Sequence, residues 1–553
     1  MAAVRLTVLA SIAIANGCGP AQQRALSGVI ITIDTTNPSA LDIYGADRGV
    51  TPFLSELARS SIVYERAHTV APITLPAHTS MMTGLYPLRH GVRDNGWARL
   101  SADAETLAER ARAAGLRTAA FVSAVVLSAP YGLDQGFELY SEPEHAPGGS
   151  LASVTQRGSR AVTDDALSWL ERTDPEQPFV MWVHYFDPHW PYEAPESFLK
   201  QAGGHAYLAE VAVMDNDIGR LVRALDERIG ADAYMLAVVA DHGESFGRHG
   251  EPTHSAFTYQ ATVQVPFLLR FPDGRRAGTR SDELVSVVDL FPTYTDVLAL
   301  GAPGQVDGIS LAGERVGEDR GLYVESYSGF LNYGWSPLSG WVNADGKYLH
   351  SSRPEYYDLA QDPKEEHDLM AQREVDVAPY LDALERLSAL PRLESSELEL
   401  DEAGLAQLRA LGYAAAGGEV RALPDPLAPS DRPAPRDQAE HHAQFSTALG
   451  LAQAGETAQA VSLLQEVLAN NPGNLFAVET LAGCLLEEDH FAQVLELLEP
   501  LAGQVADRHQ CQVYLAATYE HLGQPERALQ HYRAALLLRP TDGTVARAIS
   551  KLE

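Results

Sequence analysis

Four side chains in this sequence could together hold a metal ion and attack an ester. Thr74 opens the segment TLPAHT, Asp34 closes the apolar run GVIITID, and Asp241 and His242 close the run YMLAVVADH. Carboxylates and imidazoles bind divalent cations, and an alcohol becomes a nucleophile when a metal or a base takes its proton. Alone, a Thr ahead of Leu-Pro is typical of a helix cap. The chemical interpretation therefore depends on whether the fold brings the four positions together.

The pattern of elements predicts that it does. Short apolar, β-rich runs lie at residues 28–34, 117–124, 178–187 and 234–243, and segments with helical periodicity lie between them at 51–61 and 104–115. This alternation predicts a mostly parallel sheet with helices on both faces, and such sheets bind ligands at the carboxyl ends of their strands. Asp34, Asp241 and His242 end two of these strands. Pro76 suits the first turn of a helix, which places Thr74 at or just before its N-cap.

The composition indicates a globular protein with more than one domain. The chain has 553 residues, of which 45% are hydrophobic and 21% charged, and these are values of folded rather than disordered proteins. Its length exceeds that of one ordinary domain. The formal net charge of −33 argues against nucleic acid and anionic membrane surfaces as partners. A small anionic substrate is still compatible, because a metal or a histidine cluster reverses the field inside a pocket.

The first residues predict export. Arg5 precedes the run LTVLASIAIA, which is shorter than the roughly 20 residues that span a bilayer. Small residues then precede Cys18, as in the cleavage box of bacterial lipoproteins. We expect residues 1–25 to be a signal peptide or lipoprotein anchor that provides the sole membrane contact. The expected location is the bacterial cell envelope, either the periplasm or the outer membrane. Cys484 and Cys511 are too few for a disulfide framework and are expected to pack in helices.

Changes in composition divide the rest of the chain. A large α/β domain is expected at residues 26–375, and it ends in a small α+β subdomain with a few antiparallel strands. Residues 376–436 are expected to form a helical extension and a linker, because 414–436 are rich in Ala, Pro, Gly and charged residues.

Residues 437–553 contain an internal repeat. Ala448, Ala482 and Ala516 recur every 34 residues, and the turn positions Gly455, Asp489 and Gly523 recur with the same period. This is the tetratricopeptide period, in which each unit is a pair of helices. The repeats predict an all-α superhelix, which is normally a protein-binding surface. We therefore expect a protein partner for this region.

Several motifs follow one another in order along residues 26–370: IDTTNPSALDIYG, TPFLSELA, TLPAHTSMMTGLYPLRHGV, HYFDPHWPY, ADHGESFGRHG and YYDLAQDPKEEHDL. They resemble the sulfatase branch of the alkaline phosphatase superfamily. The resemblance implies an alkaline phosphatase-like fold for residues 26–375, with a mostly parallel sheet between two layers of helices. It also implies a metal-dependent hydrolase that acts on anionic phosphate or sulfate esters.

The resemblance places Thr74 in the slot of the nucleophile. Sulfatases carry Cys or Ser in a Cys/Ser-x-Pro-x-Arg signature and convert it to formylglycine, whereas this chain has Thr74, Pro76 and His78 in the same slots. Threonine does not supply the formylglycine aldehyde. It is, however, the nucleophile of nucleotide phosphodiesterases, phosphoethanolamine transferases and lipoteichoic acid synthases of the same superfamily. Phosphodiester or phosphonate chemistry is therefore favoured over sulfate chemistry.

A metal site is implied in the same way. Carried over by position, Asp34, Asp241 and His242 would bind the ion, and Thr74 would bridge the ion and the substrate. Sulfatases usually have a second Asp where this chain has Thr35, and Asp-Asn where it has Asp-His. Exchanging a carboxylate for an imidazole moves the site away from calcium, which takes six or more oxygens, and towards zinc or manganese.

Histidines are the candidates for proton transfer. His189, in DPHWP, matches a family His that contacts the transferred group or protonates the leaving oxygen. His254 falls where sulfatases place an active-site Lys, and His78 takes the slot of the sulfatase Arg. A His with a pKa near neutrality can donate a proton to an alkoxide leaving group. His184 and His249 are weaker candidates.

One divalent ion is expected rather than two. A two-metal phosphodiesterase site needs a further Asp and two His, and Asp187, His249 and His254 do not have the required Asp-x-x-x-His spacing. Asn95, in RDNGW, is expected near the pocket.

The sequence thus predicts an exported hydrolase of phosphate or sulfate esters with a repeat array for a protein partner. Three alternatives are open: a sulfate ester hydrolase that works without formylglycine, a phosphotransferase, and an inactive hydrolase-like scaffold whose repeats bind proteins. The several membrane-spanning helices usual in such transferases are not seen in the sequence. The presence of all four residues Asp34, Thr74, Asp241 and His242 argues against the inactive scaffold, because such a protein does not need a complete set of metal ligands and a nucleophile.

Overall fold

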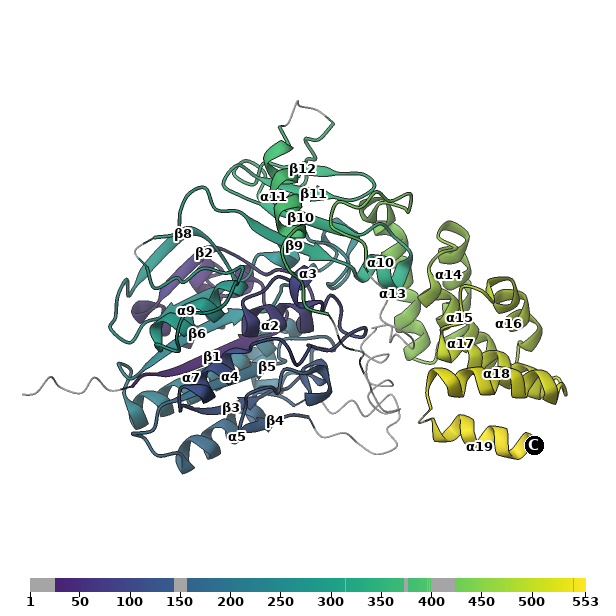
Figure 1. Cartoon of the computed structure of the whole chain (residues 1–553), viewed down its shortest axis with the longest axis horizontal. Coiled ribbons are helices and arrows are strands. Elements are labelled where there is room, and N and C mark those ends of the chain that lie inside the picture. Colours follow the sequence, from purple (N-terminus) through teal and green to yellow (C-terminus); the bar gives the residue numbers. More distant parts are fainter. Residues whose placement is uncertain are drawn as a thin grey trace, which may run out of the picture.

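Strand β1 lies at the centre of an eight-stranded sheet with the order β4-β3-β5-β1-β6-β7-β2-β8 (Figure 1). The strands are β1 (Ser27–Ile33), β2 (Ile62–His68), β3 (Arg117–Phe121), β4 (Leu139–Ser141), β5 (Phe179–Tyr185), β6 (Tyr234–Ala240), β7 (Phe267–Arg270) and β8 (Thr279–Ser286). Neighbouring strands are parallel except where β7 pairs with β6 and β2. The computed structural model describes residues 25–143, 157–313, 315–371, 376–394, 396, 398, 423–540 and 542–553.

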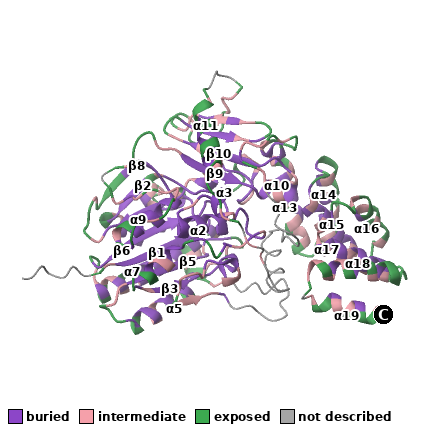
Figure 2. Cartoon of the chain, viewed as in Figure 1, coloured by how far each residue is buried: buried purple, intermediate pink, exposed green. Residues whose placement is uncertain are grey.

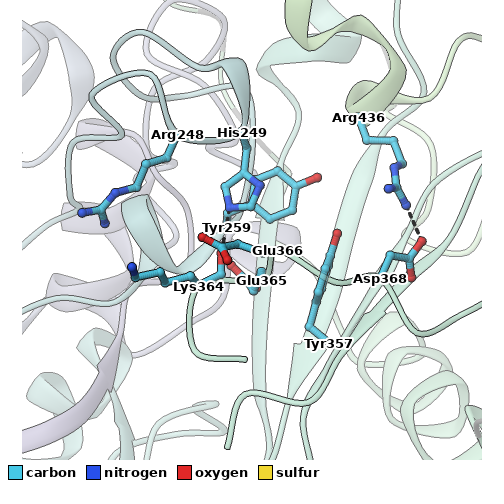
Figure 3. Close-up of a pocket in the computed structure, with 9 residues that line it drawn as sticks. All are labelled: Arg248, His249, Tyr259, Tyr357, Lys364, Glu365, Glu366, Asp368 and Arg436. Atoms are coloured by element: carbon cyan, nitrogen blue, oxygen red, sulfur yellow. Dashed lines mark hydrogen bonds and ion pairs between the residues drawn. The ribbon is translucent and has the colours of Figure 1, made fainter. Parts of the chain in front are cut away.

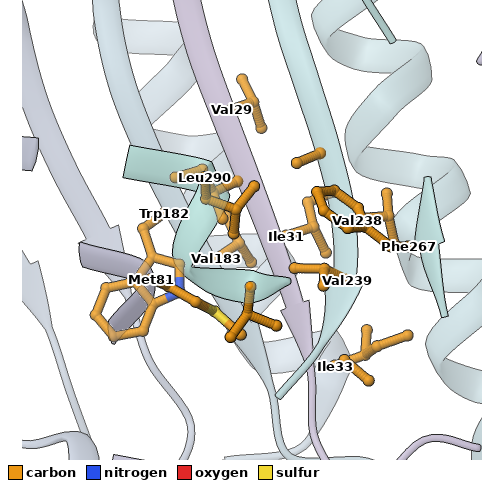
Figure 4. Close-up of a cluster of buried hydrophobic side chains, with 14 of the residues drawn as sticks. Val29, Ile31, Ile33, Met81, Trp182, Val183, Val238, Val239, Phe267 and Leu290 are labelled. Carbon is orange, nitrogen blue, oxygen red and sulfur yellow. The ribbon is translucent and has the colours of Figure 1, made fainter. Parts of the chain in front are cut away.

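Helices cover both faces of this sheet and enclose a continuous apolar core. They are α1 (Pro52–Leu57), α2 (Thr74–Thr83), α3 (Pro87–His90), α4 (Leu107–Ala113), α5 (Ser159–Arg172), α6 (Glu196–Gln201), α7 (Ala206–Ile229), α8 (Gln260–Val263) and α9 (Leu290–Val297). Figure 4 shows Met81 of α2 and Leu290 of α9 among the side chains of β1 and its neighbours. Helix α9 lies so close to β1 that a Cβ on Gly28 would come within 2.9 Å of the Tyr294 ring. Only glycine fits there.

The alternation of strands and helices in the sequence predicts this layered α/β architecture correctly. The runs at 28–34, 117–124, 178–187 and 234–243 contain β1, β3, β5 and β6. The start of α2 differs in detail from the expectation. Thr74 is the first helical residue, and Ile73, with an extended backbone, occupies the N-cap without a side-chain hydrogen bond. The Thr74 hydroxyl therefore does not cap its helix and is available for other contacts.

A second, smaller sheet follows the large one. It is antiparallel, with the order β12-β11-β10-β9, and consists of β9 (Leu322–Ser326), β10 (Leu338–Val342), β11 (Lys347–His350) and β12 (Glu355–Tyr357). Helices α10 (Ser328–Tyr333) and α11 (Ala378–Ser388) belong to the same region. A buried ion pair joins it to the loop that follows α3, because the Arg93 Nε donates to Glu325 Oε1 at 2.8 Å. The guanidinium of Arg93 also lies 3.5 Å above the Tyr327 ring.

The described end of the predicted linker follows the small sheet. The hydroxyls of Tyr327 and Ser339 donate to the carbonyls of Pro424 and Pro426, both at 2.9 Å. The backbone N–H of Ser336 donates to the carbonyl of Pro433, also at 2.9 Å. This stretch therefore holds the chain against the small sheet before the repeats begin.

The repeats form successive antiparallel helices: α13 (Ala439–Gln453), α14 (Thr457–Asn470), α15 (Leu475–Glu487), α16 (Phe491–Leu498), α17 (His509–His521), α18 (Pro525–Leu538) and α19 (Gly543–Leu552). Ala448, Ala482 and Ala516 are all completely buried, which explains why a small residue recurs there. The residues that recur in the turns between the two helices of each unit have positive φ angles: 78° at Gly455, 59° at Asp489 and 69° at Gly523. The expected tetratricopeptide fold is confirmed, and its period marks positions where the backbone turns left-handed.

The repeat array packs directly on the small sheet through aromatic rings. His442 and Phe445 of α13 lie against Tyr333, with ring centroids 5.2 and 5.7 Å apart. The Asn471 Nδ2 donates to the Tyr333 carbonyl at 2.9 Å. Buried residues continue from there through the repeat helices (Figure 2). One apolar cluster thus spans the joint between the two regions.

Among the described residues, none of the helices has both the length and the apolar character needed to cross a membrane.

Replacing Phe445 with Ala should lower the free energy of unfolding by about 3–5 kcal/mol, the usual cost of truncating a buried Phe. Because the cluster includes side chains from both regions, the unfolding midpoints of the repeats and of the α/β domain should fall together. Differential scanning calorimetry checks this, with Leu537→Ala as the control, because Leu537 is 83% exposed. A separate transition of the α/β domain that stays at its original temperature would contradict the shared cluster.

Candidate active site and metal centre

The carboxyl ends of three adjacent strands bring the predicted acidic residues together. Strand β1 lies between β5 and β6, in a register that aligns Ile33 with Tyr185 and with Ala240. Asp34 and Asp241, the next residues of β1 and β6, therefore leave the sheet side by side. Both side chains are completely buried.

His242 presents one ring nitrogen to both carboxylates. Its Nδ1 donates to the Gly243 carbonyl at 3.0 Å, which leaves Nε2 as the unprotonated nitrogen of the neutral ring. Nε2 lies 3.6 Å from Asp34 Oδ1, 3.5 Å from Asp241 Oδ2 and 3.3 Å from Thr74 Oγ1. Two ligands of one tetrahedral ion with bonds of about 2.1 Å are roughly 3.4 Å apart. The three distances from His242 Nε2 match this spacing, and ligand atoms of Asp34, Asp241 and His242 all lie within 4.8 Å of one another.

Of the four oxygens of the two carboxylates, only Asp241 Oδ1 accepts a hydrogen bond, from the backbone N–H of His242 at 2.7 Å. Both oxygens of Asp34 and the Oδ2 of Asp241 are buried without a partner, and an unpaired buried charge is costly. Burial accordingly raises the pKa of Asp34 to about 7 and that of Asp241 well above its usual range, to which Asp34 contributes by repulsion. Together with an imidazole and an alcohol, these oxygens form a donor set that suits a divalent ion such as zinc or manganese.

Helix α2 presents Thr74 to this group at its N-terminus. All ten of its residues are buried, so the position of the hydroxyl is set by core packing. The Leu75 N–H donates to Asn95 Oδ1 at 2.9 Å, which ties the start of the helix to the loop after α3. The Asn95 Nδ2 is buried without a partner. The helix N-terminus and this amide are hydrogen-bond donors that favour an anionic group beside Thr74.

Two more predicted histidines lie in the same cluster. The His254 ring is 4.4 Å from that of His242 and 5.3 Å from that of His189, between centroids. His254 Nδ1 is 3.3 Å from Glu244 Oε1. Burial lowers the pKa of His254, but the carboxylates around it, Glu244 first, outweigh burial and raise it to about 8. His254 is therefore protonated at neutral pH.

His189 has the opposite electrostatic state. Burial, followed by repulsion from His254, lowers its pKa to about 3. Its Nδ1 donates to the Trp190 carbonyl at 2.7 Å, so its Nε2 is an acceptor. The backbone N–H of His189 donates to Glu210 Oε2 at 3.1 Å, which holds the loop after β5 against α7. A neutral His189 thus stands beside a charged His254.

His78 and His184 lie in the buried interior of the cluster, beside Asp241 and Asp34. The sequence suggests His78 as a catalytic residue and treats His184 as a weaker candidate, yet both are completely buried beside the carboxylates. His78 Nδ1 lies 3.7 Å from Asp241 Oδ2, and His184 Nε2 lies 3.5 Å from Asp34 Oδ2. Their rings meet edge to face, with centroids 4.9 Å apart.

Three other residues considered from the sequence lie outside the cluster. Asp187 Oδ2 accepts the N–H of Ser159 at 2.6 Å and thereby anchors the start of α5. Thr35 donates its hydroxyl to the Pro188 carbonyl, so it holds the loop after β5 to the end of β1. His249 stacks on Tyr259 with centroids 3.9 Å apart.

His249 instead lines a separate cavity of about 440 Å³ (Figure 3). The cavity is lined by Arg248, His249, Tyr259, Tyr357, Lys364, Glu365, Glu366, Asp368 and Arg436. None of the candidate metal ligands contributes to this lining, so the cavity is distinct from the cluster around Thr74.

Sequence reasoning missed the residues that position the histidines. Glu244 stands two residues after His242 in ADHGESFG, and its contact with His254 depends on how the loop folds back. Gly243 makes this fold possible, because a Cβ there would lie 2.2 Å from Asn37 Oδ1. Only the concentration of charged residues in the loop could have indicated Glu244.

Comparison with known families identifies two regions of the chain. The sulfatase family model matches residues 28–300, and a tetratricopeptide repeat model matches residues 451–512. The first region is therefore similar to the sulfatase family over most of the large α/β domain. The second agrees with the repeat helices described above.

Curated relatives resemble the chain over most of their own length. N-acetylglucosamine-6-O-sulfatase of Bacteroides thetaiotaomicron is 21% identical over 67% of this chain and 87% of its own. YidJ, an uncharacterised sulfatase of Escherichia coli, is 23% identical over 62% of this chain and 82% of its own. Among solved structures, the phosphonate monoester hydrolase of Agrobacterium radiobacter has the same fold, with a TM-score of 0.56 and 21% identity over 66% of this chain and 94% of that one.

Metal binding should stabilise the fold, because it neutralises the buried carboxylates. Zn²⁺ or Mn²⁺ at 1,000 times its dissociation constant should add about 4 kcal/mol, and EDTA should remove this gain. The Asp241→Asn variant should lose the gain, although without metal it should be at least as stable as the wild type, since it lacks one unpaired charge. Thermal unfolding with and without metal measures both effects. A wild-type midpoint that no divalent cation raises would contradict the site.

Proposed function

We propose that the sulfatase-family domain at residues 28–300 is a metal-dependent hydrolase that acts on phosphodiesters or phosphonate esters through Thr74. The observation that carries this proposal is the position of the Thr74 Oγ1 at a helix N-terminus, 3.3 Å from His242 Nε2, a nitrogen that in turn lies close to the unpartnered oxygens of Asp34 and Asp241. Asp34, Asp241 and His242 would hold the ion. A bound divalent cation lowers the pKa of an alcohol and offsets negative charge on an ester oxygen.

The residues of this chain fit a two-step displacement. The Thr74 oxygen forms a bond to phosphorus while the bond from phosphorus to the leaving oxygen breaks. Water then attacks the Thr74 ester and releases the free enzyme and the second product. The Asn95 Nδ2 and the N-terminus of α2 are in place to donate hydrogen bonds to the transferred group.

His254 is the proposed proton donor to the leaving oxygen. It is charged at neutral pH because Glu244 lies 3.3 Å away, and Glu244 is held in turn by Tyr192, whose hydroxyl donates to Glu244 Oε2 at 3.1 Å. His189 is neutral, its Nε2 is an acceptor, and its ring faces that of His254, so it is suited to take part in the proton transfer.

The identity of the nucleophile supports phosphorus rather than sulfur as the centre attacked. Oxidation of a threonine side chain gives a ketone, so Thr74 does not give the aldehyde on which formylglycine chemistry depends. The relatives include both named sulfatases and a phosphonate monoester hydrolase, so a fold of this kind accommodates either ester. A sulfate ester hydrolase that uses the Thr74 alcohol directly is the second candidate.

Export and a protein partner are further parts of the proposal. The predicted export signal at residues 1–25 lies almost wholly outside the described residues, so the location in the cell envelope rests on the sequence alone. The repeat array supports a protein partner, because such superhelices normally bind other proteins.

Thr74→Ala should abolish turnover of the best substrate, whereas Thr74→Ser, which keeps the alcohol, should retain measurable activity. The test is a panel of p-nitrophenyl monoesters, diesters, phosphonates and sulfates, measured with Zn²⁺ and with Mn²⁺. We expect the diester or phosphonate to give the highest kcat/KM. His249→Ala is the matched control, because its ring lies outside the cluster. Sulfate as the best substrate would favour the second candidate, and full activity of Thr74→Ala would exclude both.

His254→Gln should slow the reaction in a way that depends on the leaving group. General-acid catalysis typically contributes about 10²–10⁴-fold, and this help matters most when the leaving group is basic. We therefore expect a loss in this range for phenyl esters and a much smaller loss for p-nitrophenyl esters of the same acid. Equal losses for both leaving groups would show that His254 is not the proton donor.

A further inference from the structure

The floor of the active site holds two imidazoles that the proposed reaction does not use. His78 comes from α2 and His184 from β5, and both are completely buried. The Nε2 atoms of both rings are buried and have no hydrogen-bond partner. One ring nitrogen of each lies with a carboxylate oxygen of Asp241 in a group whose members are all within 4.8 Å of one another.

The protonation of His184 follows from the contacts of Ser123. The Ser123 hydroxyl donates its hydrogen to the His184 carbonyl and accepts the N–H of Phe186 at 2.9 Å. Because that hydrogen is already used, the 3.3 Å contact of His184 Nδ1 with the same oxygen has Nδ1 as the donor. The His184 Nε2 is then an unprotonated nitrogen, and it lies 3.5 Å from Asp34 Oδ2.

His78 is fixed in the same tautomer. Its Nδ1 is 2.8 Å from the Thr74 carbonyl, which only accepts hydrogen bonds, so Nδ1 carries the hydrogen. The Nε2 of His78 is thus a second unprotonated, partnerless nitrogen. A hydrogen bond from the far ring nitrogen to a carbonyl or hydroxyl is the usual support of a metal-binding histidine.

The carboxylates face histidines on both sides. Asp34 Oδ1 lies 3.6 Å from His242 Nε2, while its Oδ2 lies 3.5 Å from His184 Nε2. Asp241 Oδ2 lies 3.5 Å from His242 Nε2 and 3.7 Å from the protonated Nδ1 of His78. Where an unprotonated nitrogen faces a carboxylate oxygen, as at His242 and His184, the lone pairs repel unless a proton or a cation lies between them. Bridging carboxylates of this kind hold two metal ions about 3.5–4 Å apart.

We propose that His78, His184, Asp34 and Asp241 form a second divalent-cation site behind the one that uses Thr74. The nitrogen and oxygen donors suit zinc better than calcium. This goes beyond the single ion expected from the sequence, and it uses none of the three residues considered there for a second metal. It rests on the proposed first site, because both sites share Asp34 and Asp241. A second cation held by these residues would add positive charge beside the shared carboxylates.

The test is the number of zinc ions bound per chain. Asp362, Glu366 and His367 form another possible metal group at the surface, so all proteins carry His367→Ala to remove it. Metal-free protein is titrated with Zn²⁺, and the bound zinc is counted by plasma mass spectrometry after gel filtration. We expect two ions per chain in this background and one in the His184→Gln variant. His68→Gln is the matched control, because His68 is also buried but has partners at both ring nitrogens; it should still bind two.

Mn²⁺ provides an independent readout. Two ions bridged by carboxylates should give an exchange-coupled electron paramagnetic resonance spectrum, and His184→Gln should convert it to the six-line spectrum of an isolated ion. If His184→Gln does not fold by circular dichroism, Ser123→Ala replaces it. That change removes the support of His184 and should weaken the second ion by about 10–100-fold while the first stays bound.

The outcomes separate this inference from the proposed function. One ion per chain in the background protein, or two ions retained in folded His184→Gln, would overturn the second site and leave the first intact. No bound ion at all would overturn both. Two ions that fall to one only when His184 or Ser123 is changed would support the second site.

Discussion

The proposed chemistry of this protein depends on two carboxylates that the fold buries with a single hydrogen-bond donor between them, the backbone N–H of His242. Asp34 and Asp241 are the first residues beyond two adjacent parallel strands, so the sheet itself forces them together. Repulsion and burial make this pair unfavourable unless protons or a cation neutralise it. The stability of the large apolar core offsets this cost, and a bound cation would relieve it. The proposed nucleophile, the imidazoles and the proposed proton donor are all arranged around these two side chains.

The parts of the molecule farther from the site hold this arrangement in place. The Arg93–Glu325 pair joins the small sheet to the loop of Asn95, which in turn contacts the start of α2. The loop that carries Glu244 and His254 packs on the first repeat helix, where a Cβ on Gly250 would lie 2.8 Å from the Ala439 side chain. The first repeat helix is therefore in contact with the loop that carries the proposed proton donor.

The sequence predicts the fold and the acidic part of the site well, because both follow from strong local signals. Strands with alternating helices fix the sheet, and residues that directly follow a buried strand must lie at its edge. The repeat period also predicts the left-handed turns, including Asp489, which takes a position otherwise occupied by glycine. Thr74 was expected at or before the N-cap, but Ile73 takes that position with an extended backbone, and Asn95 from the loop after α3 accepts the N–H of Leu75 in place of a capping side chain.

The supporting contacts could not be read from the sequence. His184 lies inside an apolar strand, where a histidine usually packs without a function, and its importance depends on the register between β1 and β5. Ser123 and Glu244 act through hydrogen bonds between segments far apart in sequence or folded back by a loop, and neither has a local pattern. The sequence shows that His78 replaces the Arg of the sulfatase signature. Only the structure shows that His78 lies beside His184 and Asp241.

Anomalous X-ray diffraction at the zinc absorption edge, from crystals grown with Zn²⁺, tests the central claim most directly. The account predicts a strong peak within about 2.0–2.2 Å of ligand atoms of Asp34, Asp241 and His242, with the Thr74 oxygen also in contact. No peak between these residues, or zinc found only at the exposed group of Asp362, Glu366 and His367, would contradict it.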